Sequence, residues 1–414
     1  MSRLAETVAP RRLGSGFRWL LASSWVSNLG DGIALAAGPL LVAAQTRDPF
    51  VVALAVLLQQ LPWLLFGLYA GALADRLDRR VLVVVVDLVR AGVLALLTAS
   101  IVTGVVSVPV VLGALFLLAS AEVFADTASS TLLPMLVPRS DLGLANARLQ
   151  TGFITVNQLA GPPLGAFLFA AGAAWPFVAQ AVLVTLGALL VSRLVLPRSD
   201  RGPSDSRHLR RDIAEGLRWV LHHPAVRTLV LTITIFNVTY GAAWSVLVLY
   251  ATERLGMGAV GFGLLTTVSA VGGLVGTTAY GWITRRVSLG DLMRVGLVVE
   301  TLTHLALALT TSARVAMVVF FLFGAHAFVW GTTATTVRQR AVPDALQGRV
   351  GSTYRLGVYG GLVLGSALGG LIAQRWGIAA PFWFAFTGSA LFCVLVWGQL
   401  AHIAHTDEQV REVP

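Results

Sequence analysis

The chain has 414 residues, of which 56% are hydrophobic and 12% are charged, and its formal net charge is +10. Soluble globular proteins usually carry about 25% charged residues, so this composition excludes an ordinary soluble domain. A positive charge of this size would suit a nucleic-acid-binding protein, but the arginines stand between apolar stretches, as they do in membrane proteins. The single cysteine, Cys393, excludes an intramolecular disulfide and argues against a Cys-ligated metal site.

Apolar stretches long enough to cross a bilayer recur along the whole chain, and the mean hydropathy is +0.78. They lack the alternation of barrel strands, and helices are the other structure that satisfies its own backbone in lipid. We therefore predict an all-α membrane protein with twelve transmembrane helices. The predicted spans are residues 17–44, 51–74, 81–103, 108–136, 150–171, 176–196, 228–251, 259–283, 289–311, 315–337, 352–373 and 380–402.

The arginines predict the orientation of these spans. If the N-terminus is inside, 25 of the 30 arginines lie in cytoplasmic segments and four lie in outside loops. This asymmetry follows the positive-inside rule, so we expect both termini in the cytoplasm. The composition, rich in Ala, Gly, Val and Arg, suits a GC-rich bacterial genome, and we expect a multi-pass protein of a bacterial plasma membrane.

The longest polar stretch lies between the sixth and seventh spans and divides the chain in two. We predict a six-helix bundle at residues 1–196, a cytoplasmic linker at 197–225 and a second six-helix bundle at 226–414. Apolar residues from Ile213 to Leu221 recur at helical spacing within the linker. They predict a short amphipathic helix, which either lies on the membrane or is solvated in the cytoplasm.

Features of the first half recur in the second, which predicts two pseudo-symmetric bundles. Three residues of the first half are repeated 205 positions later. They are Pro138, Gly165 and Gly172, and their copies are Pro343, Gly370 and Gly377. Parallel six-helix repeats are a plan of transporters, in which the substrate binds between the halves near the midplane and the halves rock around it.

A motif between the second and third spans connects the chain to a known family. It reads Gly71-Ala-Leu73-Ala74-Asp75-Arg76-Leu-Asp-Arg79-Arg80, and a degenerate copy follows the eighth span as Gly281-Trp-Ile-Thr-Arg285-Arg286. This motif resembles the signature loop of the major facilitator superfamily. Further elements resemble its branch of macrolide-efflux-like and siderophore-exporter-like proteins. They are Asn28-Leu-Gly30-Asp31, Pro138 followed by Ala145-Asn146, Asp212 to Arg218, and Gln339 to Val350. The resemblance covers essentially the whole chain and implies the major facilitator fold.

Three acidic residues within predicted spans are candidates for proton coupling: Asp31, Glu122 and Asp126. Asp31 lies about 21 Å into the first span, and Glu122 and Asp126 are four residues apart, hence on one face of the fourth. A carboxyl group inside the bilayer is costly and indicates function. The alternative is a structural polar contact, for example with Arg90. Drug antiporters of the superfamily often have Arg-x-x-Gln-Gly in this fourth span, and this chain departs from that pattern.

The loop motif is a candidate gate latch, as the resemblance implies. Asp75 would accept charge-assisted hydrogen bonds from an arginine across the interface, with Gly71, Arg76, Arg79 and Arg80 completing the corner. The alternative is a basic loop that only sets topology.

Two charged pairs are predicted from helical spacing. Asp87 and Arg90 are three residues apart in the third span and should pair near the cytoplasmic gate. Glu300 and His304 share a face of the ninth span, which the resemblance makes peripheral, so we expect a structural or gating pair. A direct proton path is the alternative.

An amphipathic substrate cavity is predicted from polar and aromatic residues of several spans. Asn237, Tyr240 and Trp244 lie on one face of the seventh span, and His326 could titrate near neutral pH. The alternative is packing between helices or against lipid. The candidates are Asn28, Gln60, Asn237, Tyr240, Trp244, His326 and Trp330.

These features predict a secondary transporter, and specifically a proton-coupled antiporter that exports a small amphipathic or hydrophobic drug, antibiotic or siderophore-like metabolite. Because the acidic candidates have no obvious cationic partner, neutral or cationic substrates are favoured. An uptake symporter or facilitator of the same fold is one alternative. A non-transporting lipid-handling factor or receptor is another. We expect no enzyme activity, no ATP-binding loop, no cofactor beyond the proton gradient, no bound metal and no nucleic-acid partner, and a monomer that functions within the lipid bilayer.

Overall fold

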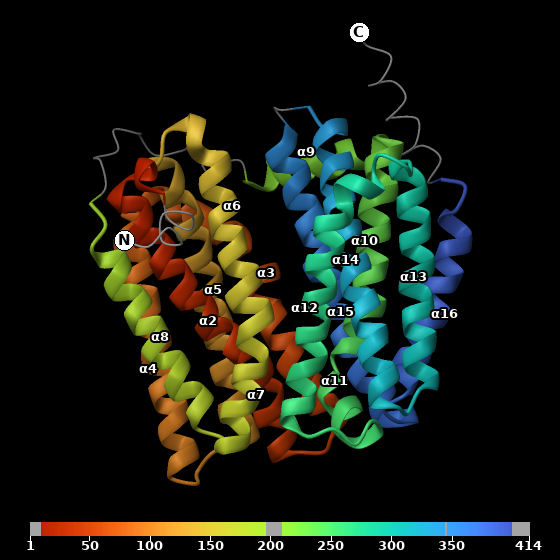
Figure 1. Ribbon diagram of the computed structural model, residues 1–414, viewed down its shortest axis with the longest axis horizontal. Helices are drawn as coiled ribbons and strands as arrows, with labels where there is room; N and C mark the ends of the chain where they lie inside the picture. Colours follow the sequence, from red (N-terminus) through yellow and green to blue (C-terminus); the bar gives the residue numbers. More distant parts are fainter. Residues whose placement is uncertain (1–9, 196–208, 344–345, 400–414) are drawn as a thin grey trace. The chain divides into compact units, whose positions relative to one another are not determined.

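The computed structural model describes residues 10–195, 209–343 and 346–399, and within them it is helical without a strand (Figure 1). Eleven helices of this described part are long and apolar enough to cross a membrane. A shorter apolar helix, α16 (Ala380–Val396), is the twelfth. The predicted all-α fold with twelve transmembrane helices is therefore confirmed.

The chain forms two compact units. Unit 1 consists of Met1–Thr46, Leu58–Ser206 and Ala259–Thr267, and unit 2 of Arg47–Leu57, Arg207–Gly258 and Val268–Pro414. The units follow the two halves of the sequence, except that the start of the second span belongs to unit 2 and the start of the eighth to unit 1. The helices of the first half are α2 (Gly14–Gln45), α3 (Pro49–Arg76), α4 (Arg79–Val102), α5 (Val108–Leu136), α6 (Leu142–Gly152), α7 (Gly161–Ala171) and α8 (Trp175–Ser192). Those that follow are α9 (Leu209–His222), α10 (Pro224–Trp244), α11 (Leu247–Leu249), α12 (Ala259–Ile283), α13 (Leu289–Leu309), α14 (Ala313–Ala341), α15 (Gln347–Trp376) and α16.

Two predicted spans differ in structure from simple helices. The fifth begins at Leu142 instead of residue 150, and a π-helix, η3 (Phe153–Ala160), joins α6 to α7. The seventh is interrupted after Trp244 and ends in a second π-helix, η5 (Tyr250–Arg254). Neither π-helix contains a proline, and their polar residues, Asn157 and Gln158 in η3 and Glu253 and Arg254 in η5, are also compatible with an ordinary α-helix, so the sequence pattern did not predict the interruptions.

Helices α10 and α15 of unit 2 pack closely because α15 presents glycine at every fourth position. A β-carbon at Gly361, Gly365 or Gly369 would lie within 2.5 Å of a carbonyl oxygen of α10. Small residues at this spacing let two membrane helices approach backbone to backbone. The stripe therefore fixes the distance between α10 and α15, and α10 carries several of the candidate cavity residues.

Substitution within this stripe should destabilise the protein. A β-carbon at Gly365 would lie 2.2 Å from the carbonyl oxygen of Val238, whereas one at Gly360 on the same helix meets nothing within 4 Å. We expect Gly365→Ala to cost about 1–3 kcal/mol through overpacking. Gly360→Ala should be neutral or stabilising by up to about 1 kcal/mol, because alanine is the better helix former. Thermal unfolding of the two purified variants tests this, and equal melting temperatures would contradict it.

The linker helix α9 packs on unit 2 instead of lying free. Its Gly216 faces the backbone of Arg349 at the start of α15, and Glu215 forms an ion pair with Arg349 at 2.9 Å. Val220 is buried in an apolar cluster with Val226, Val342 and Val350. Leu217 and Leu221 remain exposed. Both predicted alternatives, a helix on the membrane and a solvated helix, left out this docking, because it depends on a partner far along the chain. Residues 197–208 of the predicted linker lie outside the described part.

Candidate functional site

A buried arginine joins α2 and α4 of unit 1. Arg90 on α4 is 2% exposed. Its guanidinium donates to the carboxylates of Asp31 on α2 and of Asp87 one turn earlier on α4, the latter over 3.2 Å between Nη1 and Oδ1. All three residues lie more than two turns from the ends of their helices, so they belong to the membrane-spanning part. The predicted pairing of Asp87 with Arg90 is present, and Asp31 shares the same partner.

Two further carboxylates come close to this pair from α5. Glu122 and Asp126 lie one turn apart, and both interact electrostatically with Arg90 and Asp31. Arg90 therefore pairs with two carboxylates and interacts electrostatically with two more, and we call these five residues the Arg90 cluster. The expectation that the acidic candidates lack a cationic partner is wrong. The fourth span lacks the arginine of the antiporter motif, but Arg90 of the third span lies near its carboxylates.

The α5 members of the Arg90 cluster lie on a polar stripe. Asp126 is exposed, Glu122 is half-buried, and Ser130 one turn further is also exposed. These residues follow each other at intervals of four and so share a face of the helix. An ionisable group on a membrane-spanning helix is too costly to face lipid. This face of α5 is therefore directed to water or to protein.

The loop between α3 and α4 is tied to unit 1 by its arginines. Arg79 donates from Nε to the carbonyl oxygen of Ala74 over 3.1 Å, and Arg80 donates to that of Leu194 over 2.8 Å. Asp78 caps the first turn of α4 by accepting from the amides of Arg80 and Val81. Asp78 is thus a capping residue that the motif reading did not single out.

The structure does not test whether the remaining members of the predicted latch act as a gate. Gly71 has open space around it, so no close helix contact requires glycine there. Arg76 is exposed at the end of α3. The side chain of Asp75 lies outside the described part. The latch therefore stays a prediction that rests on the family motif.

Aromatic rings from α10 and α14 gather in unit 2. Tyr240 stacks on Trp244 with 4.4 Å between ring centroids, and Phe323 lies 5.8 Å from Tyr240 and 4.8 Å from Trp244. Phe320 completes the group at 5.3 Å from Trp244. We call these four residues the aromatic group. The structure thus brings together two predicted cavity residues, and it adds two phenylalanines of α14 that the sequence reading passed over.

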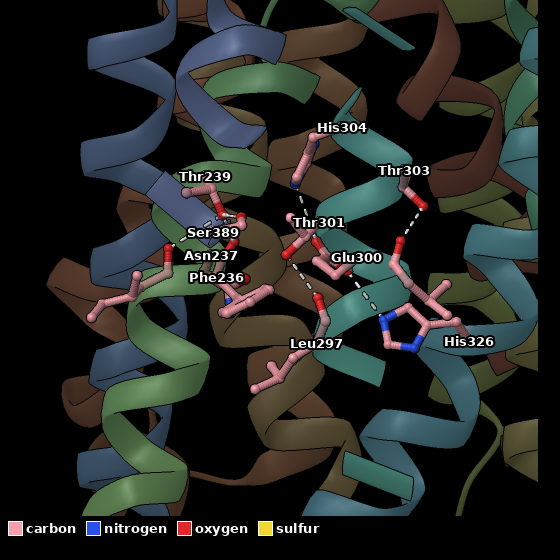
Figure 2. Close-up of polar contacts among 12 residues, drawn as sticks. Phe236, Asn237, Thr239, Leu297, Glu300, Thr301, Thr303, His304, His326 and Ser389 are labelled. Carbon is pink, nitrogen blue, oxygen red and sulfur yellow. Dashed lines mark hydrogen bonds and ion pairs between the residues drawn. The ribbon is translucent and has the colours of Figure 1, made fainter. Parts of the chain in front are cut away.

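A carboxylate between two imidazoles adjoins the aromatic group. Figure 2 shows Glu300 of α13 between His304 on its own helix and His326 on α14. One carboxylate oxygen lies 3.4 Å from Nε2 of His304, and the other lies 3.2 Å from Nε2 of His326. Helical spacing predicted the proximity of Glu300 and His304. The link to His326 depends on the packing of α13 against α14, which spacing within one helix does not reveal.

The other cavity candidates are placed separately. Asn28 and Asn237 each donate to a carbonyl oxygen one turn earlier, at 2.7 Å, and Asn157 of η3 donates to the carbonyl of Asn28. Gln60 is half-buried on α3. Trp330 is 8% exposed and packs in a core cluster with residues of α13 and α16. The structure therefore groups Tyr240, Trp244 and His326 in one part of unit 2 and places Trp330 in its core.

Comparison with known proteins identifies the family. A model of the transmembrane secretion effector family matches residues 5–412. The chain belongs to this family, within the major facilitator superfamily. It is a multi-pass membrane transporter, and its family implies small-molecule substrates. The predicted branch is confirmed as well.

Several relatives of the chain are exporters. It is 28% identical to the multidrug efflux pump Tap of Mycolicibacterium fortuitum, over 88% of this chain and 90% of that protein. It is 25% identical to macrolide efflux protein A of Streptococcus pyogenes, over 92% of this chain and 94% of that protein. It is also 25% identical to the enterobactin exporter EntS of Escherichia coli K12, over 95% of this chain and 94% of that protein. These relatives support an exporter.

The fold is also that of solved transporters. The structure of a bacterial homologue of the iron transporter ferroportin superposes with a TM-score of 0.76 and 17% identity, over 93% of this chain and 98% of that one. A bacterial homologue of the lysosomal transporter Spinster superposes with a TM-score of 0.70 and 14% identity, over 97% of this chain and 98% of that one. Identities this low establish the shared fold and nothing about the substrate.

Proposed function

We propose that this transporter is a proton-driven antiporter that exports small amphipathic or hydrophobic compounds. The observation that carries the proposal is the Arg90 cluster of unit 1, in which one guanidinium pairs with two carboxylates and interacts electrostatically with two more. If all four were ionised, three negative charges would be left without a counter-charge. Such an excess is costly in a low-dielectric surrounding, and it is relieved when a carboxylate takes up a proton.

The polar stripe on α5 gives these protons a route to solvent. Glu122 and Asp126 lie on the side of α5 that cannot face lipid, while Asp31 and Asp87 are held by Arg90 behind them. We therefore assign proton uptake and release to Glu122 and Asp126. Arg90, Asp31 and Asp87 would stay charged. The protonation of Glu122 and Asp126 would then change the net charge of the Arg90 cluster.

The relatives support the direction and the substrate class. They are named as efflux pumps for multiple drugs and for macrolides, and as an exporter of enterobactin. The uptake symporter or facilitator of the same fold remains the alternative to be separated by experiment. A non-transporting receptor or lipid-handling factor is disfavoured, because family and fold are those of transporters.

Inverted membrane vesicles test the proposal. Vesicles from cells that express the protein would be given macrolides, cationic dyes and a catecholate siderophore, with and without an imposed inside-acid pH gradient. We expect at least one compound to accumulate only with the gradient, and an uncoupler to abolish this accumulation. Control vesicles lack the protein. Transport of a compound at the same rate with or without the gradient would instead indicate a facilitator.

A further inference from the structure

Unit 2 contains a second titratable group that the Arg90 cluster does not explain. Glu300 is 8% exposed and His304 is fully buried, and His326 is 10% exposed at its side chain. The three side chains come from α13 and α14 and meet as Figure 2 shows. We call them the His–Glu–His triad.

The triad has no fixed positive charge. Among the described residues, the charged groups that interact with Glu300 are His304 and His326. Asp291 and Arg294 pair with each other about two turns nearer the start of α13.

The elements packed against α13 contribute few titratable groups. From α10, the phenol of Tyr240 faces Glu300, and from α16 the described residues supply the thiol of Cys393, which lies in the core cluster. From η5, Arg254 and Tyr250 hydrogen-bond to carbonyl oxygens of α13 beyond His304. None of these groups is a counter-ion placed beside Glu300.

One proton makes the triad electrically neutral. With two neutral imidazoles and an ionised Glu300, a single negative charge is buried among α10, α13 and α14. Burial of an unpaired ion is costly, and an imidazole is the side chain whose ordinary pKa lies in the physiological range. Adding one proton gives a carboxylate with one imidazolium, which each carboxylate oxygen is placed to stabilise.

An unpartnered nitrogen of His304 points to the same role. Neither ring nitrogen of His304 has a partner with hydrogen-bond geometry among the described residues, although Nε2 is 3.4 Å from Glu300. A buried donor or acceptor without a partner is rare and calls for a reason. A small movement of His304 toward Glu300 would let Nε2–H donate to the carboxylate, and a positive charge on the ring would strengthen that bond.

The triad also adjoins the aromatic group. The rings of His304 and Trp244 meet edge to face with 6.0 Å between centroids, and those of His326 and Phe323 meet at 6.4 Å. An imidazolium at His304 would lie at about the limit of cation–π distance from Trp244. A positive charge on His304 would therefore repel a second cation bound at the aromatic rings.

We propose that Glu300, His304 and His326 form a proton-binding site in unit 2 that takes up one proton and is separate from the Arg90 cluster. Its consequence for transport rests on the proposed function: a proton on the triad and a cationic substrate on the aromatic group would exclude each other. Proton binding itself does not depend on the direction or the existence of coupled transport.

Nitrogen NMR of the histidines tests the site directly. The full-length protein would be labelled with ¹⁵N-histidine in lipid nanodiscs, and the seven histidines would be followed from about pH 5 to 8.5, a range that brackets the ordinary imidazole pKa. His304→Asn and His326→Asn assign the two signals. We expect both signals to shift together at one common midpoint, because the two rings share one proton.

Variants separate this proposal from the previous one. Glu300→Gln should abolish the shared transition, and Glu122→Gln in unit 1 should leave it unchanged. The exposed His222 of α9, which lies on another helix, serves as an internal reference in every variant. The proposal is overturned if the folded wild-type protein keeps both rings neutral throughout, or if the two rings titrate independently and ignore Glu300→Gln. Because the wild-type result is decisive, a variant that fails to fold does not weaken the test.

Discussion

Replacing Arg90 with methionine is expected to destabilise the protein by about 3–5 kcal/mol, the usual cost of removing one partner from a buried ion pair. The guanidinium is 2% exposed and is the counter-charge for Asp31 and Asp87. Methionine fills similar space but leaves both carboxylates without a cation. Thermal unfolding and the yield of monodisperse protein in detergent measure the loss.

Removing the carboxylates together with the arginine provides the matched control. The triple variant Arg90→Met, Asp31→Asn, Asp87→Asn also removes the two carboxylates that hydrogen-bond to Arg90 and leaves Glu122 and Asp126 in place, so it should regain part of the stability that the single variant loses. A single variant as stable as the wild type would show that the ion pairs contribute nothing. A triple variant no better than the single one would show that the loss does not come from unpaired Asp31 and Asp87.

Neutralising both carboxylates of the α5 stripe should uncouple transport from the proton gradient. In the variant Glu122→Gln, Asp126→Asn, we expect gradient-driven accumulation in inverted vesicles to fall at least about tenfold, equivalent to about 1.4 kcal/mol. Exchange of labelled for unlabelled substrate should persist, because it requires the movement of the units but no net proton flux. Initial rates of both processes, measured in the same vesicles, give the comparison.

The control for this variant is a carboxylate that lies outside the Arg90 cluster. Asp291 at the start of α13 is exposed and pairs locally with Arg294. Asp291→Asn should retain gradient-driven accumulation. If the double variant accumulates substrate as the wild type does, Glu122 and Asp126 have no part in coupling. If it loses exchange as well, they serve binding or folding.

The membrane fold was predictable because its signals are local. Each span is a run of apolar residues, and the segments between the runs are alternately rich and poor in arginine. The close packing of α10 on α15 was also readable, since Gly357, Gly361, Gly365 and Gly369 recur at the spacing of membrane helix contacts. The sequence reading did not use that stripe.

The contacts that matter most for function join separate helices and were only partly predictable. Spacing along one helix predicted that Asp87 meets Arg90 and that Glu300 meets His304. It did not reveal that Arg90 approaches Glu122 and Asp126, nor that His326 reaches Glu300. These pairs arise where α4 packs on α5 and α13 on α14, and the rotation of each helix about its axis decides them. The π-helices were missed because their residues fit an ordinary helix equally well.

Proton counter-flow in proteoliposomes tests the central claim most directly. Purified protein would be reconstituted with a pH-sensitive dye in the lumen, and a compound identified in the vesicle screen would be added outside. Antiport predicts that substrate entry drives protons out, so the lumen becomes alkaline at a rate that saturates with substrate and disappears in the variant Glu122→Gln, Asp126→Asn. Protein-free liposomes correct for passive entry of weak bases. Saturable substrate entry with no change of lumenal pH beyond that of protein-free liposomes would contradict the account.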